Sequence, residues 1–252
     1  MFAGPNGSGK STLKDYLPAA LLGVYLNPDE IEKEVRRRGF LAFSEYGVTT
    51  TEIEVLEFFR ISELLAKAGL AEAVQTLAFA DGRLDFTRVK IDSYLASVAT
   101  DFLRQRLLIQ RSTFTFETVM SHPGKVALLT QAQAAGYRTY LYFVATDDPA
   151  INISRVKNRV TLGGHSVPEE LIVKRYYRSL ELLMEAIRHS NRAYVFDNSG
   201  DNVDRSHTWL AEITDGRILE LMTDWIPAWF KRSVLDKIPI RPRPEIDSLP
   251  QS

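Results

Sequence analysis

Eight residues near the start of the chain constrain its fold more than any other segment. Residues 4–11 read Gly-Pro-Asn-Gly-Ser-Gly-Lys-Ser, which fits the phosphate-binding loop (P-loop) pattern Gly-x-x-x-x-Gly-Lys-Ser/Thr in full. Glycines let such a backbone curl until several N–H groups converge on phosphate oxygens. A helix that starts near Lys10 aims its positive end at the same point. The pattern therefore predicts a nucleotide-binding loop.

Two side chains of the loop have specific chemical tasks. We expect Lys10 to reach the β- and γ-phosphates and the Ser11 hydroxyl to ligate Mg²⁺. The residues that we expect to hold the nucleotide are Gly4, Pro5, Asn6, Gly7, Ser8, Gly9, Lys10, Ser11 and Thr12.

Short apolar segments rich in β-formers alternate with longer helical stretches. After the loop, the strand-like segments are 23–27, 112–118, 138–144 and 193–197. Such alternation favours a parallel sheet with helices on both faces. With residues 1–3 as the strand that enters the loop, we expect an α/β protein of the P-loop NTPase fold with a parallel five-stranded sheet. Because this first strand is so short, either it is unusual or the natural chain starts further upstream.

The segment 40–111 is far longer than one crossover between parallel strands needs. Apolar residues at helical spacing occupy 50–79 and 85–109, and Asp81-Gly82 predicts a turn between them. We therefore expect a helical insertion after the second strand. The insertion either has a purely structural role, packing against the rest of the chain, or forms a lobe that binds a substrate at the carboxyl edge of the sheet.

The last third of the chain adds two helices, a hairpin and a tail. Helices are expected over 149–161 and 168–189, a region where P-loop kinases carry a lid. Residues 208–221 predict a hairpin that turns at Asp215-Gly216. The proline-rich segment 238–252 predicts a flexible tail. Residues 1–237 are expected to form a single domain.

Composition narrows the class of protein. The 31 Lys and Arg residues nearly balance the 32 Asp and Glu residues, so no overall field favours nucleic acid or an anionic membrane. The absence of cysteine excludes disulfides, thiolate catalysis and cysteine-ligated zinc. The sequence shows neither an apolar run long enough for a membrane span nor a signal-peptide pattern. We expect a soluble, cytoplasmic protein with a small-molecule partner.

A P-loop predicts nucleotide binding, but it does not distinguish the classes of protein that use the nucleotide in different ways. The sequence lacks an ABC-type signature, a long apolar strand ending in Asp-Glu, and the guanine-reading motif Asn-Lys-x-Asp. These gaps disfavour transporter ATPases, motors and GTPases. Small-molecule kinases remain, and they need an acceptor site, a base near the acceptor hydroxyl, and arginines around the transferred phosphoryl group.

Two carboxylates follow strands at the edge where such sheets bind ligands. Asp29 lies just past the segment 23–27, where it is either a catalytic base or a first-turn residue of a helix capped by Asn27. Glu117 lies near the end of the segment 112–118, beside the expected phosphate site or at a half-exposed edge.

Basic residues gather on both sides of Gly163-Gly164-His165, at positions Arg155, Lys157, Arg159, Lys174, Arg175 and Arg178. Such a stretch is either a solvated face or part of a lid that closes over phosphate. Its position after the fourth strand favours the lid, with Arg159, Arg175 and Arg178 as catalytic arginines.

Five blocks of the chain together resemble the zeta-toxin-like P-loop kinases, often labelled predicted ATPases. In order, they are GPNGSGKSTL, YLNPDEI, FTFETVMS, SRVKNRVTLGGHSVPEELIVKRYYRSL and YVFDNSG. The resemblance spans most of residues 2–200. The first block is common to many P-loop proteins, whereas the Asn-Pro-Asp, Phe-Glu-Thr, Gly-Gly-His and Arg-Tyr-x-Arg-Ser-Leu blocks are more specific.

The resemblance implies a kinase fold that uses ATP and Mg²⁺. In the best-known members it implies 3′-phosphorylation of UDP-N-acetylglucosamine, which poisons cell-wall synthesis. It places Asp29 as the base, Glu117 with Thr118 in a substrate-side acidic motif, and Arg175 with Arg178 among the lid arginines. Arginines of the helix 149–161 match less closely. The insertion 40–111 has no counterpart in compact members, so the identity of the acceptor stays open. Whether the protein is a toxin with a protein antitoxin is equally open, since the sequence shows no such partner.

We therefore expect a kinase that transfers the γ-phosphoryl group of ATP to a hydroxyl of a small acceptor, with a UDP-N-acetyl amino sugar as first choice. The alternatives are a kinase of a nucleoside or other metabolite, and a nucleotide-gated binding module that phosphorylates no acceptor. A carboxylate after the second strand and arginines in a lid favour the kinase, because a switch needs neither.

Overall fold

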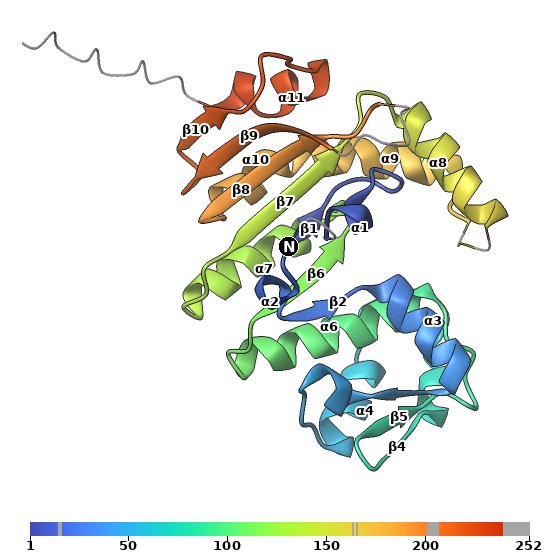
Figure 1. Cartoon of the computed structure of the whole chain (residues 1–252). Coiled ribbons are helices and arrows are strands. Elements are labelled where there is room, and N and C mark those ends of the chain that lie inside the picture. Colours follow the sequence, from blue (N-terminus) through green and yellow to red (C-terminus); the bar gives the residue numbers. More distant parts are fainter. Residues whose placement is uncertain (15–16, 163, 165, 201–206, 239–252) are drawn as a thin grey trace, which may run out of the picture.

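In a computed structural model of the chain, a mixed sheet carries the P-loop at its carboxyl edge. The structure describes residues 1–14, 17–162, 164, 166–200 and 207–238. Within them, seven strands form the sheet in the order β10-β9-β8-β7-β1-β6-β2 (Figure 1). Their bounds are β1 Phe2–Ala3, β2 Val24–Leu26, β6 Phe114–Thr118, β7 Tyr140–Ala145, β8 Arg192–Asp197, β9 Thr208–Thr214 and β10 Ile218–Leu221.

Five of these strands are parallel, as predicted. β1 has two residues and pairs in parallel with β6 on one side and β7 on the other. The expectation of a five-stranded sheet is wrong, however, because the hairpin of β9 and β10 joins the sheet antiparallel to β8. Its turn lies at Asp215-Gly216, where both residues have positive φ angles of 48° and 65°. The turn prediction is therefore confirmed.

Helices cover one face of the sheet far more completely than the other. The longer helices have the bounds α3 Pro28–Arg38, α6 Ser93–Ile109, α7 Pro123–Ala134, α8 Pro149–Thr161, α9 Glu169–Glu181 and α10 Leu183–Arg188. Of these, α6, α7 and α10 lie behind the sheet in Figure 1. The short helices α1 (Lys10–Leu13) and α2 (Ala19–Leu22) follow the P-loop.

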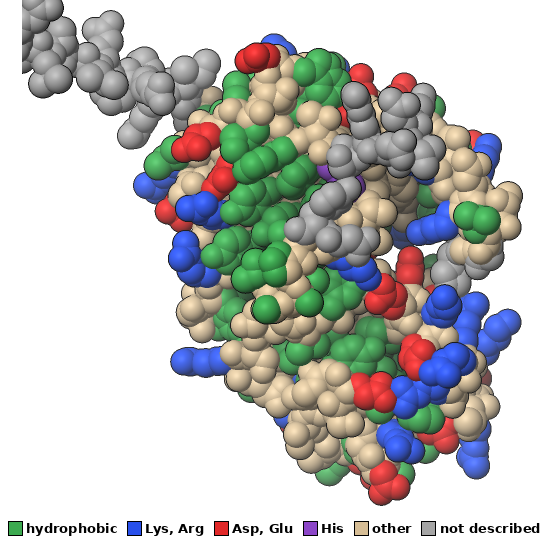
Figure 2. Space-filling view, in the orientation of Figure 1, with side chains coloured by type: hydrophobic (Ala, Val, Ile, Leu, Met, Phe, Trp, Pro, Cys, Tyr) green, Lys and Arg blue, Asp and Glu red, His purple; other side chains and the backbone are tan. Residues whose placement is uncertain are grey.

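Among the described residues, no helix covers the opposite face over β8, β9 and most of β7, so the prediction of helices on both faces holds only in part (Figure 1). Aromatic rings line this open face, with Tyr142 and Tyr194 stacked at 4.9 Å between ring centroids and Phe196 stacked on Trp209 at 6.4 Å. Figure 2 shows the resulting band of hydrophobic side chains. The hairpin of β9 and β10 extends the sheet beyond β8.

The insertion is not purely helical, which corrects the sequence-based expectation. It holds a three-stranded antiparallel sheet in the order β3-β5-β4, with bounds β3 Phe40–Ala42, β4 Ala78–Ala80 and β5 Arg83–Asp85. Asp81-Gly82 forms the turn between β4 and β5, with φ angles of 51° and 71°. Two helices, α4 (Glu52–Arg60) and α5 (Glu63–Lys67), precede this hairpin.

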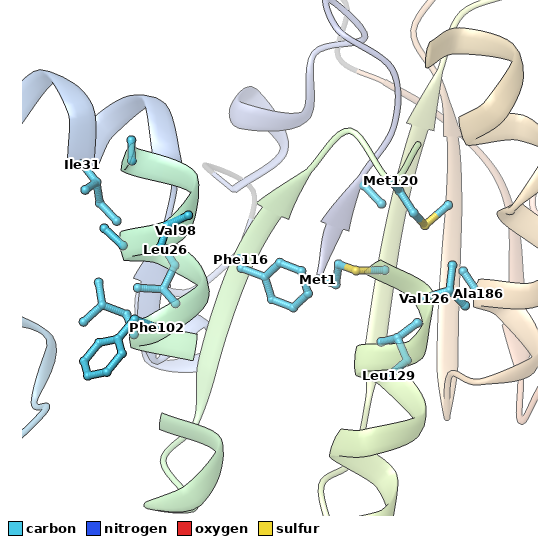
Figure 3. Packing of buried hydrophobic residues seen from close by; sticks show 14 of the residues in the cluster. Met1, Leu26, Ile31, Val98, Phe102, Phe116, Met120, Val126, Leu129 and Ala186 are labelled. Carbon is cyan, nitrogen blue, oxygen red and sulfur yellow. The ribbon is translucent and has the colours of Figure 1, made fainter. Parts of the chain in front are cut away.

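A continuous apolar core joins the insertion to the sheet. It contains Phe102 of α6 and Phe116 of β6, both less than one-tenth exposed. Figure 3 shows Phe116 pointing toward Met1, and Met1 near Met120 and Val126. The last helix of the described part is α11 (Ala228–Ser233), whose Trp229 is buried against Phe143 of β7. The tail predicted for 238–252 lies outside the described residues beyond Ile238.

No helix in the described part of the chain is long and apolar enough to cross a membrane.

Candidate functional site

The P-loop adopts a conformation that only glycine allows at its key positions. It connects β1 to α1, and Gly4, Gly7 and Gly9 have φ angles of 143°, 74° and 92°. A Cβ atom at Gly4 would lie 2.0 Å from the Val144 carbonyl oxygen, and one at Gly9 would lie 2.2 Å from Asn198 Nδ2. The glycines of the motif are therefore required both by backbone angle and by close packing.

Lys10 lies at the centre of the predicted site residues. Its Nζ donates to the carbonyl oxygens of Gly4 at 2.9 Å and Pro5 at 2.8 Å. Burial lowers the pKa of Lys10 to about 8, which nearby Glu117 and Asp29 oppose and Arg159 assists. The structure thus brings Asp29, Glu117 and Arg159 within electrostatic reach of the P-loop lysine.

The Ser11 hydroxyl, the predicted metal ligand, donates to Glu117 Oε2 at 3.0 Å. Tyr25 OH donates to the other oxygen of the same carboxylate. Among the described residues, no group of three or more His, Asp or Glu side chains could hold a metal ion by itself. One hydroxyl beside one carboxylate suits Mg²⁺, which usually keeps several waters and takes its other ligands from substrate phosphates.

Buried polar atoms of the loop also fit an anionic ligand. Ser8 is fully buried, and neither its Oγ nor Asn6 Oδ1 has a hydrogen-bond partner within the described ranges. Buried polar atoms are nearly always paired, so two such atoms in one loop indicate a place for a further polar group. Thr12 Oγ1 instead donates to the Gly9 carbonyl oxygen at 2.8 Å.

Asp29 lies in the first turn of α3 but does not cap it. Asn27 is the capping residue, since its Oδ1 accepts from the Asp29 backbone N–H at 2.9 Å, and Pro28 begins the helix. The Asp29 side chain is 61% exposed and lies 3.8 Å from an Arg159 nitrogen of α8. The carboxylate therefore faces α8 rather than its own helix end.

The two arginines of α9 lie apart from the P-loop. Arg175 is half-buried, and burial lowers its pKa while nearby Tyr94, at the start of α6, opposes the shift. Arg178 is exposed. In the part of the chain that is described, neither makes a hydrogen bond or ion pair with the loop. Gly163 and His165 lie outside the described residues, and the N–H of Gly164 donates to the Arg159 carbonyl oxygen at 2.9 Å.

Sequence reasoning missed three side chains that contact the loop directly. Asn152 of α8, Asn198 after β8 and His207 before β9 each lie within hydrogen-bond distance of a P-loop carbonyl oxygen. Asn198 follows a strand at the ligand-binding edge, so the strand-end rule could have found it. Nothing in the sequence distinguishes Asn152 from other helical residues.

Fold and loop together define an α/β protein with a P-loop at the carboxyl edge of a mostly parallel sheet, where ligands of such folds bind. Figure 2 shows acidic and basic side chains on both sides of a notch at this edge.

The chain matches no protein-family model and no curated protein sequence. It does match solved structures. A chain of the AvrRxo1-ORF1:AvrRxo1-ORF2 complex with sulphate ions superimposes with a TM-score of 0.53 at 14% identity, over 88% of this chain and 60% of that chain. For the same complex with ATP the TM-score is 0.49 at 12% identity, with the same coverage of 88% and 60%. This chain spans about 60% of the length of the matched chain, and the likeness shows the fold alone.

Proposed function

We propose that the chain is an ATP-dependent kinase that phosphorylates a hydroxyl group of a small acceptor, with a UDP-N-acetyl amino sugar as first choice. One observation carries the proposal. Ser11 of the P-loop donates to Glu117 Oε2 at 3.0 Å, and Asp29 lies 3.8 Å from an Arg159 nitrogen, so two carboxylates and an arginine from three different elements surround Lys10. A loop that only binds a nucleotide needs no second carboxylate at its edge, whereas a kinase needs a base near the acceptor.

The P-loop and Lys10 hold the β- and γ-phosphates in this proposal. To do so, Lys10 Nζ exchanges the Gly4 and Pro5 carbonyl oxygens for phosphate oxygens. Ser11 and Glu117 would hold Mg²⁺, which would neutralise charge on the phosphates of the nucleotide. Tyr25 keeps the Glu117 carboxylate turned toward Ser11.

Asp29 serves as the base. The acceptor oxygen forms a bond to the γ-phosphorus, the bond from that phosphorus to the β-γ bridging oxygen breaks to release ADP, and the hydroxyl proton passes to the Asp29 carboxylate. Arg159 lies beside this carboxylate and can neutralise charge on the transferred group. Arg175 and Arg178 of the predicted lid would join it by moving their side chains toward the transferred group when ATP and the acceptor bind, with α8 and α9 held in place.

We further propose that residues 40–111 form an acceptor-binding lobe within a single kinase domain over 1–237. The proximity of Arg175 to Tyr94 supports this, because it brings the lid region to the start of α6, which ends the insertion. The matched AvrRxo1-ORF1 was crystallised with AvrRxo1-ORF2, which supports a protein partner here, such as an antitoxin.

The test is ATP consumption with a panel of nucleotide sugars, nucleosides and other metabolites, with products identified by mass spectrometry. A phosphorylated UDP-amino sugar made by the wild type and not by Lys10→Ala would support the proposal. Phosphorylation of a nucleoside or other metabolite would change the acceptor class. ATP hydrolysis with no phosphorylated acceptor would favour the nucleotide-gated binding module.

A further inference from the structure

Carbonyl oxygens of the P-loop are bound by side chains from other parts of the chain. Asn152 Nδ2 donates to the Asn6 carbonyl oxygen at 2.6 Å, and Asn198 Nδ2 donates to that of Ser8 at 2.9 Å. Nε2 of His207 lies 2.9 Å from the Gly9 carbonyl oxygen. These three residues come from α8, the end of β8 and the start of β9.

The direction of a carbonyl group decides where the next N–H points. A peptide unit is planar and trans, so its C=O and N–H point to opposite sides. When a carbonyl oxygen is held on the outer side of the loop, the N–H of the following residue is turned to the inner side. There it can join the concave set of N–H groups that binds an anion. A carbonyl turned inward would instead repel phosphate.

We propose that Asn152, Asn198 and His207 are positioning residues that hold the P-loop in its phosphate-binding conformation; this inference rests on the proposed function. None of the three is expected to touch the nucleotide. They act through the carbonyl oxygens of Asn6, Ser8 and Gly9, as residues that hydrogen-bond to the ligands of a metal fix the orientation of those ligands.

Asn152 is itself held in one orientation. Its side chain is fully buried, and its Oδ1 accepts a hydrogen bond from Thr146 Oγ1. Tyr176 of α9 donates from its hydroxyl to the Thr146 carbonyl oxygen at 2.7 Å. Because Oδ1 is bound to a donor, the amide places Nδ2 toward the loop. The chain of contacts also ties α9, which carries Arg175, to the P-loop.

Asn198 and His207 are fixed by their own neighbours. The Asn198 backbone N–H donates to the Ala145 carbonyl oxygen at 2.8 Å, and Arg155 donates to the Asn198 carbonyl oxygen at 2.7 Å. The His207 ring packs edge-on against Phe196, with centroids 6.3 Å apart. Because the Gly9 carbonyl oxygen can only accept, the contact requires a hydrogen on Nε2. Burial lowers the pKa of His207, which favours the neutral ring.

The experiment measures the affinity for ATP with Mg²⁺ by calorimetry, alongside thermal unfolding and steady-state kinetics of the full chain. Asn152→Asp and Asn198→Asp replace the donor by an acceptor of the same shape, and Asn152→Ala and Asn198→Ala remove it without adding charge. Each loses one hydrogen bond to the loop, so affinity should fall about 5- to 50-fold. KM for ATP should rise more than kcat falls. Asn158→Asp, an exposed change on the same helix, should bind like the wild type.

The His207 pair tests the role through rescue. Gln places an Nε2 donor near the position of the histidine Nε2, whereas Leu has none. His207→Gln should therefore bind ATP more tightly than His207→Leu, at similar melting temperatures. This pair decides the question if an Asn152 variant fails to fold.

Several outcomes would overturn the inference. If both alanine variants bound ATP like the wild type, any loss in the aspartate variants would be a charge effect, and positioning would be wrong. Equal affinity of His207→Gln and His207→Leu would have the same meaning. A wild-type protein that bound no ATP would overturn the proposed function as well, so the two failures are distinguishable.

Discussion

Replacing Asp29 by Asn separates a catalytic base from a structural carboxylate. The structure indicates that the Asp29 carboxylate contributes little to the free energy of unfolding. Asn27 already supplies the capping oxygen, so Asp29→Asn loses only the interaction of the carboxylate with the helix dipole and the pair with Arg159. At 3.8 Å, with side chains 61% and 45% exposed, that pair contributes about 0–1 kcal/mol. The free energy of unfolding should therefore fall by no more than about 1 kcal/mol, or ~2–4 °C in Tm.

The expected loss of catalytic rate in Asp29→Asn is much larger than the loss of stability. A base must accept the proton of the acceptor hydroxyl, and an amide cannot do so at neutral pH. Phosphoryl transfer should fall by about 10²–10⁴, the usual range for a positioned general base. ATP affinity should change little, because Lys10 and the loop remain intact. The assays are thermal unfolding, ATP calorimetry and single-turnover transfer to the best acceptor of the panel.

Glu30→Gln is the matched control. It removes a carboxylate one residue further along α3, where Glu30 pairs with Lys14 at 3.0 Å. It should leave transfer close to the wild-type rate. If Asp29→Asn were fully active while Glu30→Gln failed, the base would be Glu30. If both variants were active, Asp29 would be only a first-turn residue, and the base would have to be sought at Glu117.

Three further predictions concern the phosphate side of the site. Lys10→Ala should abolish transfer, because the lysine charge stabilises the β- and γ-phosphate oxygens; near-normal turnover would show that the P-loop has another role. The pKa of Lys10 is lowered to about 8, so the ligand-free protein loses this charge as pH rises through 8; the ATP association constant should decline above pH 8 in the wild type and stay flat in Lys10→Met. Arg175→Ala should lower kcat more than it weakens ATP binding. It should also lower kcat more than Arg178→Ala does, because Arg175 is half-buried beside Tyr94 and Arg178 is exposed. Wild-type kcat in both variants would identify this stretch as a solvated basic face.

The P-loop and the parallel strands were predictable because local rules determine them. Gly4 and Gly9 occupy positions where any other residue would collide with neighbouring atoms, so the motif determines the backbone conformation of the loop. The segment around β7 is apolar on both faces, since the adjacent residues Phe143 and Val144 point to opposite faces and are both fully buried, which is the pattern of a central parallel strand. The first turn of α3, Asn-Pro-Asp, likewise specified its own cap.

The insertion was mispredicted because its apolar residues do not all face the core. Ile53 and Ile61, which lie at helical spacing, are 75% and 71% exposed. Two helices with a break at Ile61 replace the expected continuous pattern, and the chain then turns into β4. Whether 78–80 forms a strand depends on pairing with β5, which in turn pairs with β3 about forty residues upstream. Single-sequence periodicity contains no information on such pairing.

The carboxylates beside the P-loop also show how the parts of the proposed site depend on one another. A polyphosphate bound at Lys10 would lie near Glu117 and Asp29, and like charges in a partly desolvated cleft repel strongly. Arg159 offsets Asp29 on one side of the site. On the other side, the described residues place the Ser11 and Tyr25 hydroxyls on the two Glu117 oxygens and Lys10 nearby. Once Lys10 binds the phosphates, a cation shared with them would balance the Glu117 charge. The arrangement therefore favours a nucleotide that arrives with its divalent ion over one that arrives without it, and it leaves the Asp29 carboxylate free to interact with the acceptor.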